Sequence, residues 1–307
     1  MSSSHRVGRL DDLSPLPEAR RSQLSASGLD PDGVEALVAL ALREDLGDGT
    51  DITSAATVDP DHLGRGRFVT RRPGTIAGLP IAAAVIEMVC GADASVELVV
   101  ADGAAVDAGV ELARADAPTR GLLTSERTAL NLLCHLSGVA TLTARWVDAL
   151  AGTRAQVRDT RKTTPGLRAL EKYAVRCGGG VNHRMGLSDA ALVKDNHIAA
   201  AGSVGDAFRR VRGLAGSVSV EIEVDDIDGL VEAIEAGADE VLIDNFSIDE
   251  MRRAVAVRNE LRPGVALEAS GGLTLDTARG VGATGVDYIA VGELTHSAPI
   301  LDIGLDM

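Results

Sequence analysis

Positively charged side chains gather in one stretch of this chain. The sequence contains only three lysines, Lys162, Lys172 and Lys194, although it contains 27 arginines. The same stretch also holds Arg158, Arg161, Arg168, Arg176, His183 and Arg184. A lysine ammonium is compact and its pKa shifts readily, so it can serve where a guanidinium cannot. Since the whole chain carries a net charge of −15, this local basic region predicts a pocket for a small anionic substrate.

Within this stretch, Arg161 and Arg184 are the residues best suited to grip carboxylates. A guanidinium offers two parallel N–H groups to a carboxylate, which fixes the orientation as well as the position of the ligand. His183 directly precedes Arg184 and follows the loop Cys177–Val181, which contains three glycines. An isolated histidine is usually structural, but beside Arg184 it is a candidate anion ligand.

Three carboxylates are expected at strand ends. Glu221 and Glu223 are two residues apart in a predicted strand, so both point to one face, and Asp244 ends the next strand. Such carboxylates suit sugar hydroxyls, a Mg²⁺ shell or a developing cation. We expect Glu223 and Asp244 to be functional, and Glu221 to pair with an arginine or lysine in the lumen of the barrel.

A glycine turn, Ser270-Gly271-Gly272, joins an apolar strand to a predicted helix. Backbone amides at such a junction can bind a phosphate with help from the helix N-terminus. Gly292, after the next strand, would complete this site. An ordinary strand-to-helix turn is the alternative.

The histidine and cysteine spacings in the sequence predict neither a zinc site nor a catalytic thiol. His197 and His296 follow strand ends, but paired-histidine zinc spacing is absent. The three cysteines include no CxxC pair, which predicts reduced thiols and a cytoplasmic location. Cys177 is the cysteine nearest the basic region, and we expect it to be a packed helix residue rather than a nucleophile.

In the second half of the chain, the elements that must position these residues follow a repeating strand–helix pattern. Apolar strand-like runs alternate with amphipathic helical stretches about every 20–26 residues, which predicts parallel strands joined by right-handed crossovers. The expected strands are Ala155–Arg158, Ala191–Lys194, Ser217–Val224, Glu240–Ile243, Val265–Ala269 and Val286–Val291. Reactive groups follow the carboxyl ends of all of them. A barrel would bring these ends to one site, whereas an open doubly wound sheet would spread them, so the barrel is favoured.

The first half predicts an α+β domain. Helices are expected at Pro31–Leu46, Pro80–Cys90 and Ser125–Ala151, the last broken at Gly138, with short strands between them. The predicted fold is an α/β barrel, incomplete and TIM-like with about six parallel strands, preceded by an N-terminal α+β sandwich domain. The expected divisions are a disordered arm at 1–27, the α+β domain at 28–134, the barrel at 135–292, and a C-terminal segment at 293–307 that packs back on the first domain.

Arg127 requires a separate explanation. It lies near the start of the helix expected at Ser125–Ala151, where the helix dipole disfavours a cation. Reaching into a substrate site, including that of another subunit, would explain it.

Composition excludes several functions. The acidic net charge argues against nucleic acid or an anionic membrane as a partner. No window of 18 apolar residues predicts a transmembrane helix, and residues 1–27 lack the apolar core of a signal peptide.

Several motifs in their order along the chain resemble the quinolinate phosphoribosyltransferase family, also called nicotinate-nucleotide pyrophosphorylase (carboxylating). The resemblance covers roughly residues 30 to 307. Its most specific parts are Asp159-Thr160-Arg161-Lys162-Thr163-Thr164-Pro165-Gly166, Leu170-Glu171-Lys172-Tyr173, Gly178 to Arg184, and Lys194-Asp195-Asn196-His197. It continues through Glu126-Arg127-Thr128, Asp244-Asn245-Phe246, Glu268-Ala269-Ser270-Gly271-Gly272 and Leu294-Thr295-His296-Ser297.

The resemblance implies an enzyme of de novo NAD biosynthesis, a pentosyltransferase that moves phosphoribose from phosphoribosyl pyrophosphate to quinolinate with loss of CO₂. It implies Mg²⁺, held mainly through the substrate with Glu223 and Asp244 as candidate ligands. It also implies a homodimer in which Arg127 enters the neighbouring subunit's site, and leaves a higher oligomer open. The quinolinate ligands would be Arg127, Thr160, Arg161, His183, Arg184 and Lys194. The phosphoribosyl pyrophosphate ligands would be Lys162, Glu223, Asp244, Ser270, Gly271, Gly272, Gly292 and His296. Lys162, Lys194, Glu223 and Asp244 would carry the catalysis. Glu293 departs from the family pattern, which expects a small residue there.

Three alternatives are weaker. A related protein encoded with molybdate transport genes shares the fold, but the complete set of Arg127, Arg161, His183 and Arg184 argues against it. A barrel aldolase would use Lys162 or Lys194 as a Schiff base and would need a desolvated lysine. A non-enzymatic phosphate-sensing module would leave the carboxylates unexplained.

Overall fold

The structure, a computed structural model, describes residues 13–307, which form two compact units. The first unit contains residues 13–142 together with Pro165–Gly178 and Ala298–Met307. The second contains Thr143–Thr164 and Gly179–Ser297. Both units are therefore assembled from segments that are separated in the sequence.

A four-stranded antiparallel sheet forms the centre of the first unit, in the order β12-β1-β5-β3. Its strands are β1 (Leu63–Thr70), β3 (Ser95–Leu98), β5 (Glu111–Pro118) and β12 (Ile303–Asp306), and a small second sheet pairs β2 (Gly74–Thr75) with β4 (Ala105–Val106). Strand β12 brings the last residues of the chain next to β1, with Thr70 opposite Ile303.

Helix α4 (Leu79–Cys90) packs against this sheet, and every one of its residues is buried. Helices α1 (Glu18–Ala26) and α2 (Pro31–Leu46) contact α4 in turn. Asp30 caps α2, as expected, by accepting from the backbone N–H groups of Asp32 and Gly33. The disordered arm expected at 1–27 is wrong for α1, whose Leu24 is buried in this layer, while residues 1–12 lie outside the described residues. A short helix, α3 (Ile52–Thr57), and a 3₁₀ turn, η2 (Gly91–Asp93), complete the unit.

One long helix, α5 (Thr119–Ala149), runs from the first unit into the second without a break. The expected break at Gly138 is wrong. A Cβ on Gly138 would lie 2.2 Å from the carbonyl oxygen of Pro299, so the glycine allows the backbone at Pro299 and Ile300 to approach the helix. The expected helix start near Ser125 is also wrong, since α5 begins six residues earlier. The domain boundary drawn at 134/135 falls inside this helix.

The second unit confirms the predicted incomplete barrel. Six parallel strands follow the order β6-β11-β10-β9-β8-β7, and β6 and β7 lie at opposite edges of the curved sheet. They are β6 (Gln156–Arg158), β7 (Ala190–Val193), β8 (Ser219–Val224), β9 (Glu240–Asp244), β10 (Ala266–Ser270) and β11 (Tyr288–Ala290). Each expected strand is present, within three residues at its ends.

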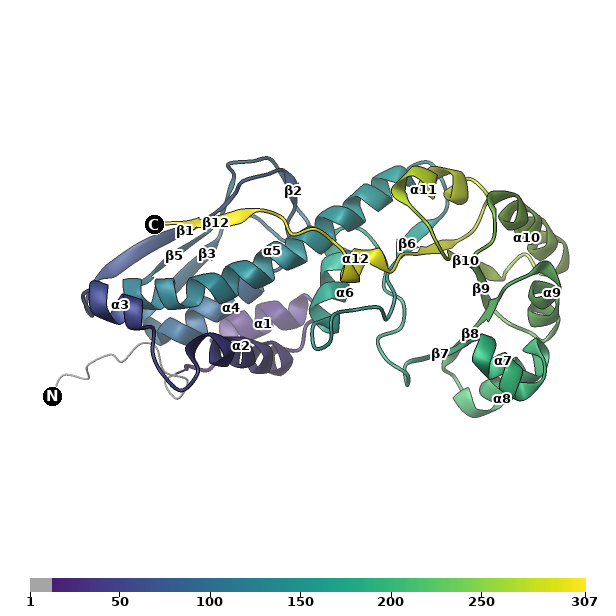
Figure 1. The fold of residues 1–307 in the computed structure, drawn as a ribbon, viewed down its shortest axis with the longest axis horizontal. Helices are drawn as coiled ribbons and strands as arrows, with labels where there is room; N and C mark the ends of the chain where they lie inside the picture. The colour runs from purple at the N-terminus through teal and green to yellow at the C-terminus, as the bar shows by residue number, and fades with distance from the viewer. Residues whose placement is uncertain (1–12) are drawn as a thin grey trace. The chain divides into compact units, whose positions relative to one another are not determined.

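Helices cover the outer face of this sheet, as Figure 1 shows. They are α7 (Asp195–Ala201), α8 (Val204–Ala215), α9 (Ile227–Glu235), α10 (Ile248–Leu261) and α11 (Leu275–Gly282), and the short α12 (Glu293–His296) follows the last strand. Several begin at side-chain caps. Ser247 and Glu250 form a capping box at α10, and Asp226 accepts from Gly229 N–H at α9. The loops that follow β8 and β9 therefore lead directly into helices whose first turns are capped.

The remaining helix, α6 (Arg168–Cys177), belongs to the first unit although it follows the first barrel strand in sequence. Tyr173 donates a hydrogen bond to Asp102 at 2.7 Å, and His135 contacts Glu171 at 2.9 Å. Lys172 is fully buried in this helix.

Candidate active site

The carboxyl ends of the barrel strands surround a pocket of about 340 Å³ in the second unit. Nine of the residues predicted from the sequence line it: Thr160, Arg161, Lys162, His183, Arg184, Lys194, Glu223, Asp244 and Ser270. Leu192, Leu242, Glu268 and Ala290 complete the lining. Residues from seven different segments therefore meet at one site, as the barrel topology requires.

The loop after β6 supplies two cations. Thr160 Oγ1 accepts a hydrogen bond from the backbone N–H of Lys162 at 2.9 Å, and the carbonyl oxygen of Lys162 accepts one from Thr295 Oγ1 at 2.9 Å. Within residues 13–307, neither Arg161 nor Lys162 forms an ion pair with a carboxylate, and the Nε of Arg161 is buried without a hydrogen-bond partner. These cations are thus held in place by backbone contacts and are available to an anionic ligand.

The segment after the three glycines places His183 and Arg184. Asp159, which is fully buried, accepts from the backbone N–H of His183 at 2.9 Å and from Asn182 Nδ2 at 2.5 Å. Arg184 donates to the carbonyl oxygen of Ala190 at 3.1 Å. Burial, and secondarily the nearby charge of Arg161, lower the pKa of Arg184. Two guanidiniums therefore lie close enough to repel each other, and an anion between them would relieve that repulsion.

Two carboxylates face these cations from β8 and β9. Glu223 forms an ion pair with Lys194, whose side chain remains 46% exposed. Asp244 accepts a hydrogen bond from the side-chain amide of Asn245 at 2.7 Å. A desolvated lysine for Schiff-base chemistry is therefore not found at Lys194, and Lys162 is exposed as well.

The glycine turn after β10 has the backbone that a phosphate site needs. Gly271 and Gly272 both have positive φ angles, of 90° and 60°. A side chain at Gly271 would collide with Asn245, whereas nothing lies within 4 Å of the position where a Cβ on Gly272 would be. Ser270 lines the pocket, and Gly271 and Gly272 follow it directly.

The next turn explains the unusual Glu293. Its carboxylate accepts from the indole N–H of Trp146 at 3.2 Å, so this side chain is engaged with a buried tryptophan of the same unit. A Cβ on Gly292 would lie 3.0 Å from Cδ of Lys162 and 3.2 Å from Nε2 of His296. Gly292 and His296 therefore adjoin Lys162, although they do not line the pocket.

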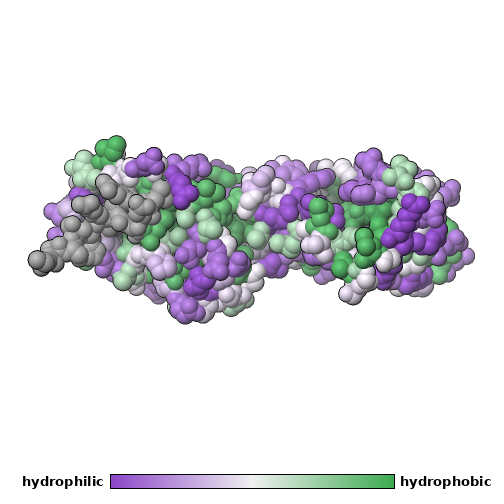
Figure 2. Space-filling view, turned by 90° about the horizontal axis from the view of Figure 1, so that it is seen from below, coloured by the Kyte–Doolittle hydropathy of each residue, from purple (hydrophilic) through white to green (hydrophobic). Residues whose placement is uncertain are grey.

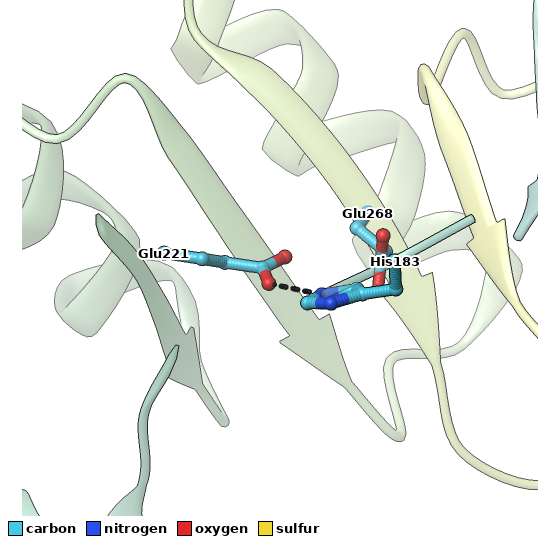
Figure 3. A group of neighbouring side chains, drawn as sticks. All are labelled: His183, Glu221 and Glu268. Carbon is cyan, nitrogen blue, oxygen red and sulfur yellow. Dashed lines mark hydrogen bonds and ion pairs between the residues drawn. The ribbon is translucent and has the colours of Figure 1, made fainter. Parts of the chain in front are cut away.

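Beneath the pocket lies a buried charge network that sequence reasoning largely missed. Arg158 pairs with Glu268 at 2.7 Å and with Glu240, and its guanidinium lies 3.8 Å from the centre of the Tyr288 ring. Glu221 accepts from His183 Nε2 at 2.7 Å, and Glu268 Oε1 is 3.7 Å from the same nitrogen, as Figure 3 shows. We expected Glu221 to pair with a lumen arginine or lysine, but its partner is this histidine. Burial raises the pKa of Glu221 and of Glu268 to about 8.

His183, Glu221 and Glu268 lie close enough together for a metal ion to be considered. The hydrogen bonding argues against one. Nδ1 of His183 accepts from the backbone N–H of Arg184 at 2.7 Å, so the ring proton of the neutral imidazole is on Nε2, the nitrogen that faces the carboxylates. A protonated nitrogen cannot ligate a metal, and the Arg158 guanidinium, 2.7 Å from Glu268, would repel a cation at this carboxyl group.

Two sequence candidates lie in the first unit. Arg127 is inside α5, so the argument from the helix dipole does not apply. Its side chain is 67% exposed and lies 3.6 Å from the carboxylate of Glu126. Cys177 ends α6, and burial raises its pKa to about 11, which agrees with an unreactive thiol.

A second cavity of about 560 Å³ shares Arg161, Arg184, Leu192 and Lys194 with the pocket. Its other walls are mostly apolar and include Leu187, which is 74% exposed. On the face seen in Figure 2, hydrophobic surface of the second unit lies directly beside hydrophilic surface. The cationic groups thus border an apolar hollow that could hold an aromatic ring or be covered by another chain.

No helix among residues 13–307 is long and apolar enough to cross a membrane.

Comparison with known proteins agrees with this geometry. Residues 51–137 match the N-terminal domain, and residues 139–306 the C-terminal domain, of quinolinate phosphoribosyl transferase. The nicotinate-nucleotide pyrophosphorylase [carboxylating] of Mycobacterium leprae is 53% identical over 268 residues, which cover 87% of this chain and 94% of that protein. The human protein of the same name is 38% identical, covering 91% of this chain and 93% of its own length. A solved nicotinate-nucleotide pyrophosphorylase from Francisella tularensis is 37% identical and superimposes with a TM-score of 0.85, covering 90% of this chain and 96% of that one. The chain therefore belongs to the quinolinate phosphoribosyltransferase family.

Proposed function

We propose that this protein transfers the phosphoribosyl group of phosphoribosyl pyrophosphate to quinolinate, with decarboxylation, giving nicotinate mononucleotide, pyrophosphate and CO₂. The observation that carries the proposal is the composition of the barrel-end pocket. Arg161 and Lys162 have no carboxylate partner among residues 13–307, and the carboxylates of Glu223 and Asp244 lie opposite them. A dicarboxylate and a polyphosphate both need such cations, and the transferred sugar needs the carboxylates.

Quinolinate would bind between Arg161, Arg184 and Lys194, with Thr160 and His183 beside them. Its two carboxylates match the guanidiniums of Arg161 and Arg184, which repel each other when no anion is present. The aromatic ring would extend toward the apolar hollow next to Leu192.

Phosphoribosyl pyrophosphate would bind on the other side of the pocket. Lys162 would contact its pyrophosphate, and Glu223 and Asp244 would accept hydrogen bonds from the ribose hydroxyls. The turn Ser270–Gly272 would bind the 5′-phosphate through backbone N–H groups, which the open space at Gly272 permits. Gly292 and His296 would complete this region next to Lys162.

The chemistry follows from this placement. The ring nitrogen of quinolinate forms a bond to C1 of the ribose as the C1–oxygen bond to pyrophosphate breaks. Positive charge develops on the sugar, and Glu223 and Asp244 stabilise it electrostatically. The ring nitrogen is then cationic, so the electron pair left at C2 by the departing CO₂ is stabilised, and a proton from solvent completes the product.

Mg²⁺ would be bound mainly through the pyrophosphate, with Glu223 and Asp244 as the candidate protein ligands. Carboxylate oxygens of two neighbouring strands are suitable donors for this ion, which usually keeps several waters and substrate oxygens as ligands. When bound, it would neutralise charge on the leaving pyrophosphate.

We also propose a homodimer in which Arg127 of one chain reaches the pocket of the other. The exposed Arg127 side chain and the exposed apolar rim at Leu187 both support a partner at this site.

The decisive experiment incubates purified protein with quinolinate, phosphoribosyl pyrophosphate and Mg²⁺, and measures CO₂ release and nicotinate mononucleotide formation. We expect turnover with quinolinate and none with nicotinate, which offers only one carboxylate to the guanidiniums of Arg161 and Arg184. An Arg161→Ala variant should be inactive. Turnover equal to background for the wild-type protein, under conditions where it is folded, would overturn the proposal.

A further inference from the structure

His183 is held through both of its ring nitrogens. Nδ1 accepts the backbone N–H of Arg184 at 2.7 Å, and Nε2 lies 2.7 Å from Glu221 Oε2. Since the lone pair of Nδ1 accepts this hydrogen bond, the ring proton is on Nε2, and the Nε2–H group donates a hydrogen bond to Glu221. The ring orientation, the tautomer and the backbone position of Arg184 are thus coupled.

Two strands supply the carboxylates that flank this ring. Glu221 is on β8 and Glu268 is on β10, and their exposed fractions are 3% and 0%. Figure 3 shows both side chains directed at His183 from separate strands. Glu268 is fixed in turn by Arg158, at 2.7 Å, and one oxygen of each glutamate is buried without a hydrogen-bond partner.

The loop that carries His183 would not fix this ring by itself, because it follows a run of three glycines. Glu268 lines the pocket, and Glu221 lines a smaller cavity on the far side of His183. His183 and Arg184 line both. The imidazole therefore separates two cavities, where Glu221 holds Nε2, the backbone N–H of Arg184 holds Nδ1, and Glu268 flanks the ring at 3.7 Å.

We propose that Glu221 and Glu268 are positioning residues for quinolinate, which act by fixing the ring of His183 and, through it, Arg184. This inference rests on the proposed function, since it assigns the ligand of that same pocket. The glutamates themselves do not contact the reacting atoms. In metal sites, removing the group that orients a ligating histidine typically costs about 10- to 100-fold in affinity or activity, and we expect an effect at the low end of that range for this histidine.

The test compares Glu221→Gln, Glu221→Leu and Glu268→Gln with a matched control, Glu87→Gln. Glu87 is also buried and accepts from an arginine, Arg20, at 2.8 and 3.0 Å, but it lies in the first unit. We expect Glu221→Leu to raise the KM for quinolinate about tenfold. Glu221→Gln, which keeps an acceptor oxygen, should have a smaller effect. In both Glu221 variants, the KM for phosphoribosyl pyrophosphate should change less than about twofold. Glu87→Gln should change the KM of neither substrate.

A double-mutant cycle separates positioning from general stabilisation. In a His183→Ala background, Glu221→Gln should have no further effect on the KM for quinolinate, because its effect passes through the imidazole. Equal effects with and without His183 would overturn the proposal.

Nitrogen-15 NMR of the wild-type protein tests the geometry without any variant at the glutamates. The His183 signals, assigned by their loss in His183→Ala, should show the Nε2-protonated neutral ring. A ring protonated at Nδ1 would overturn the proposal whatever the kinetics. Wild-type protein without turnover would instead count against the proposed function and leave this NMR result standing.

Discussion

At the scale of single residues, the pocket is distinguished by two cations that have no carboxylate partner in the described part of the chain. Arg161 and Lys162 have no carboxylate partner within residues 13–307, whereas Arg158, a few residues earlier, has two. Burying part of a guanidinium without a partner is unfavourable unless a ligand supplies one. The contrast between Arg158 and Arg161 therefore separates a structural arginine from a binding one.

Gly292→Ala should weaken the binding of phosphoribosyl pyrophosphate. The backbone of Gly292 has φ of −69°, which alanine tolerates, but the added methyl group would press on Cδ of Lys162 at 3.0 Å and on His296. Displacing the Lys162 ammonium should raise the KM for phosphoribosyl pyrophosphate about tenfold while the melting temperature changes little. Steady-state kinetics measure this. Gly264→Ala, where nothing lies within 4 Å of the new methyl, is the control. An unchanged KM would show that Lys162 does not contact this substrate.

Residue types alone predicted the cations, but not the network below them. Arg161, Arg184 and Lys194 are informative because their charge has few other uses in an acidic chain. Glu268 was not predicted, although it interrupts the otherwise apolar strand Ala266–Ser270, and a buried charge requires a partner. Its partner, Arg158, lies 110 residues earlier in the sequence, and spacing cannot reveal such a pair.

At the scale of elements, helix α5 shows how a tertiary contact overrides local preference. Glycine disfavours a helix interior by about 1 kcal/mol relative to alanine, so a break at Gly138 was a reasonable expectation. The helix continues because the segment Pro299–Ile300 packs against the position that a side chain would occupy. The strands of the second unit were predictable because their apolar runs and spacing are local properties. The contact of Gly138 with Pro299 and Ile300 joins residues 161 and 162 positions apart, which no local pattern reveals.

Gly138→Ala should therefore destabilise the protein despite the better helix propensity of alanine. The new Cβ would lie 2.2 Å from the Pro299 carbonyl oxygen and 2.9 Å from Cα of Ile300, so backbone must move. Overpacking of this kind lowers the free energy of unfolding by about 1–3 kcal/mol. Gly213→Ala in α8, with open space around the new methyl, should instead stabilise by about 0.5–1 kcal/mol. Urea denaturation measures both, and equal stabilisation by both substitutions would contradict the contact.

The strands β8 and β10 also make stability depend on pH. Burial raises the pKa of Glu268 to about 8, above its ordinary value of 4.5. The folded protein thus binds more protons than the unfolded protein between these values, so the free energy of unfolding falls as pH rises through them. Glu268→Gln removes this effect. Its destabilisation relative to wild type should be largest near pH 5 and shrink toward pH 8.5, measured by thermal unfolding at each pH. A difference that stays constant or grows with pH would show that Glu268 is ionised throughout.

At the scale of the whole molecule, the chain assembles each unit from separated segments. Helix α6 was expected in the barrel because it follows a barrel strand, yet Tyr173 bonds to Asp102 and Glu171 to His135 in the first unit. The amphipathic pattern of Arg168–Cys177 predicts a helix but cannot say which core its apolar face enters. On either side of α6, the chain carries Arg161 with Lys162, and His183 with Arg184. Both site loops are thus continuous with a helix that is anchored in the first unit.

The shared site that we propose makes a prediction about mixed dimers. Arg127→Ala removes the residue that a chain would lend to its partner, and Lys162→Ala removes one that it would use itself, so each homodimer should be inactive. A heterodimer of the two has one site with both residues intact. Random exchange makes half of the dimers mixed, with one good site of two, so the mixture should recover about a quarter of wild-type activity.

The control for this complementation uses two substitutions in the same pocket. Arg161 and Lys162 both line one chain's barrel end, so a mixture of Arg161→Ala and Lys162→Ala leaves every site with one defect and should recover nothing. Subunit exchange is verified by native mass spectrometry of differently labelled chains. Recovery in the control as well as in the test pair would place Arg161 or Lys162 in the partner's site. Recovery in neither, with exchange complete, would place Arg127 outside the shared site, and its exposed side chain would then need another role.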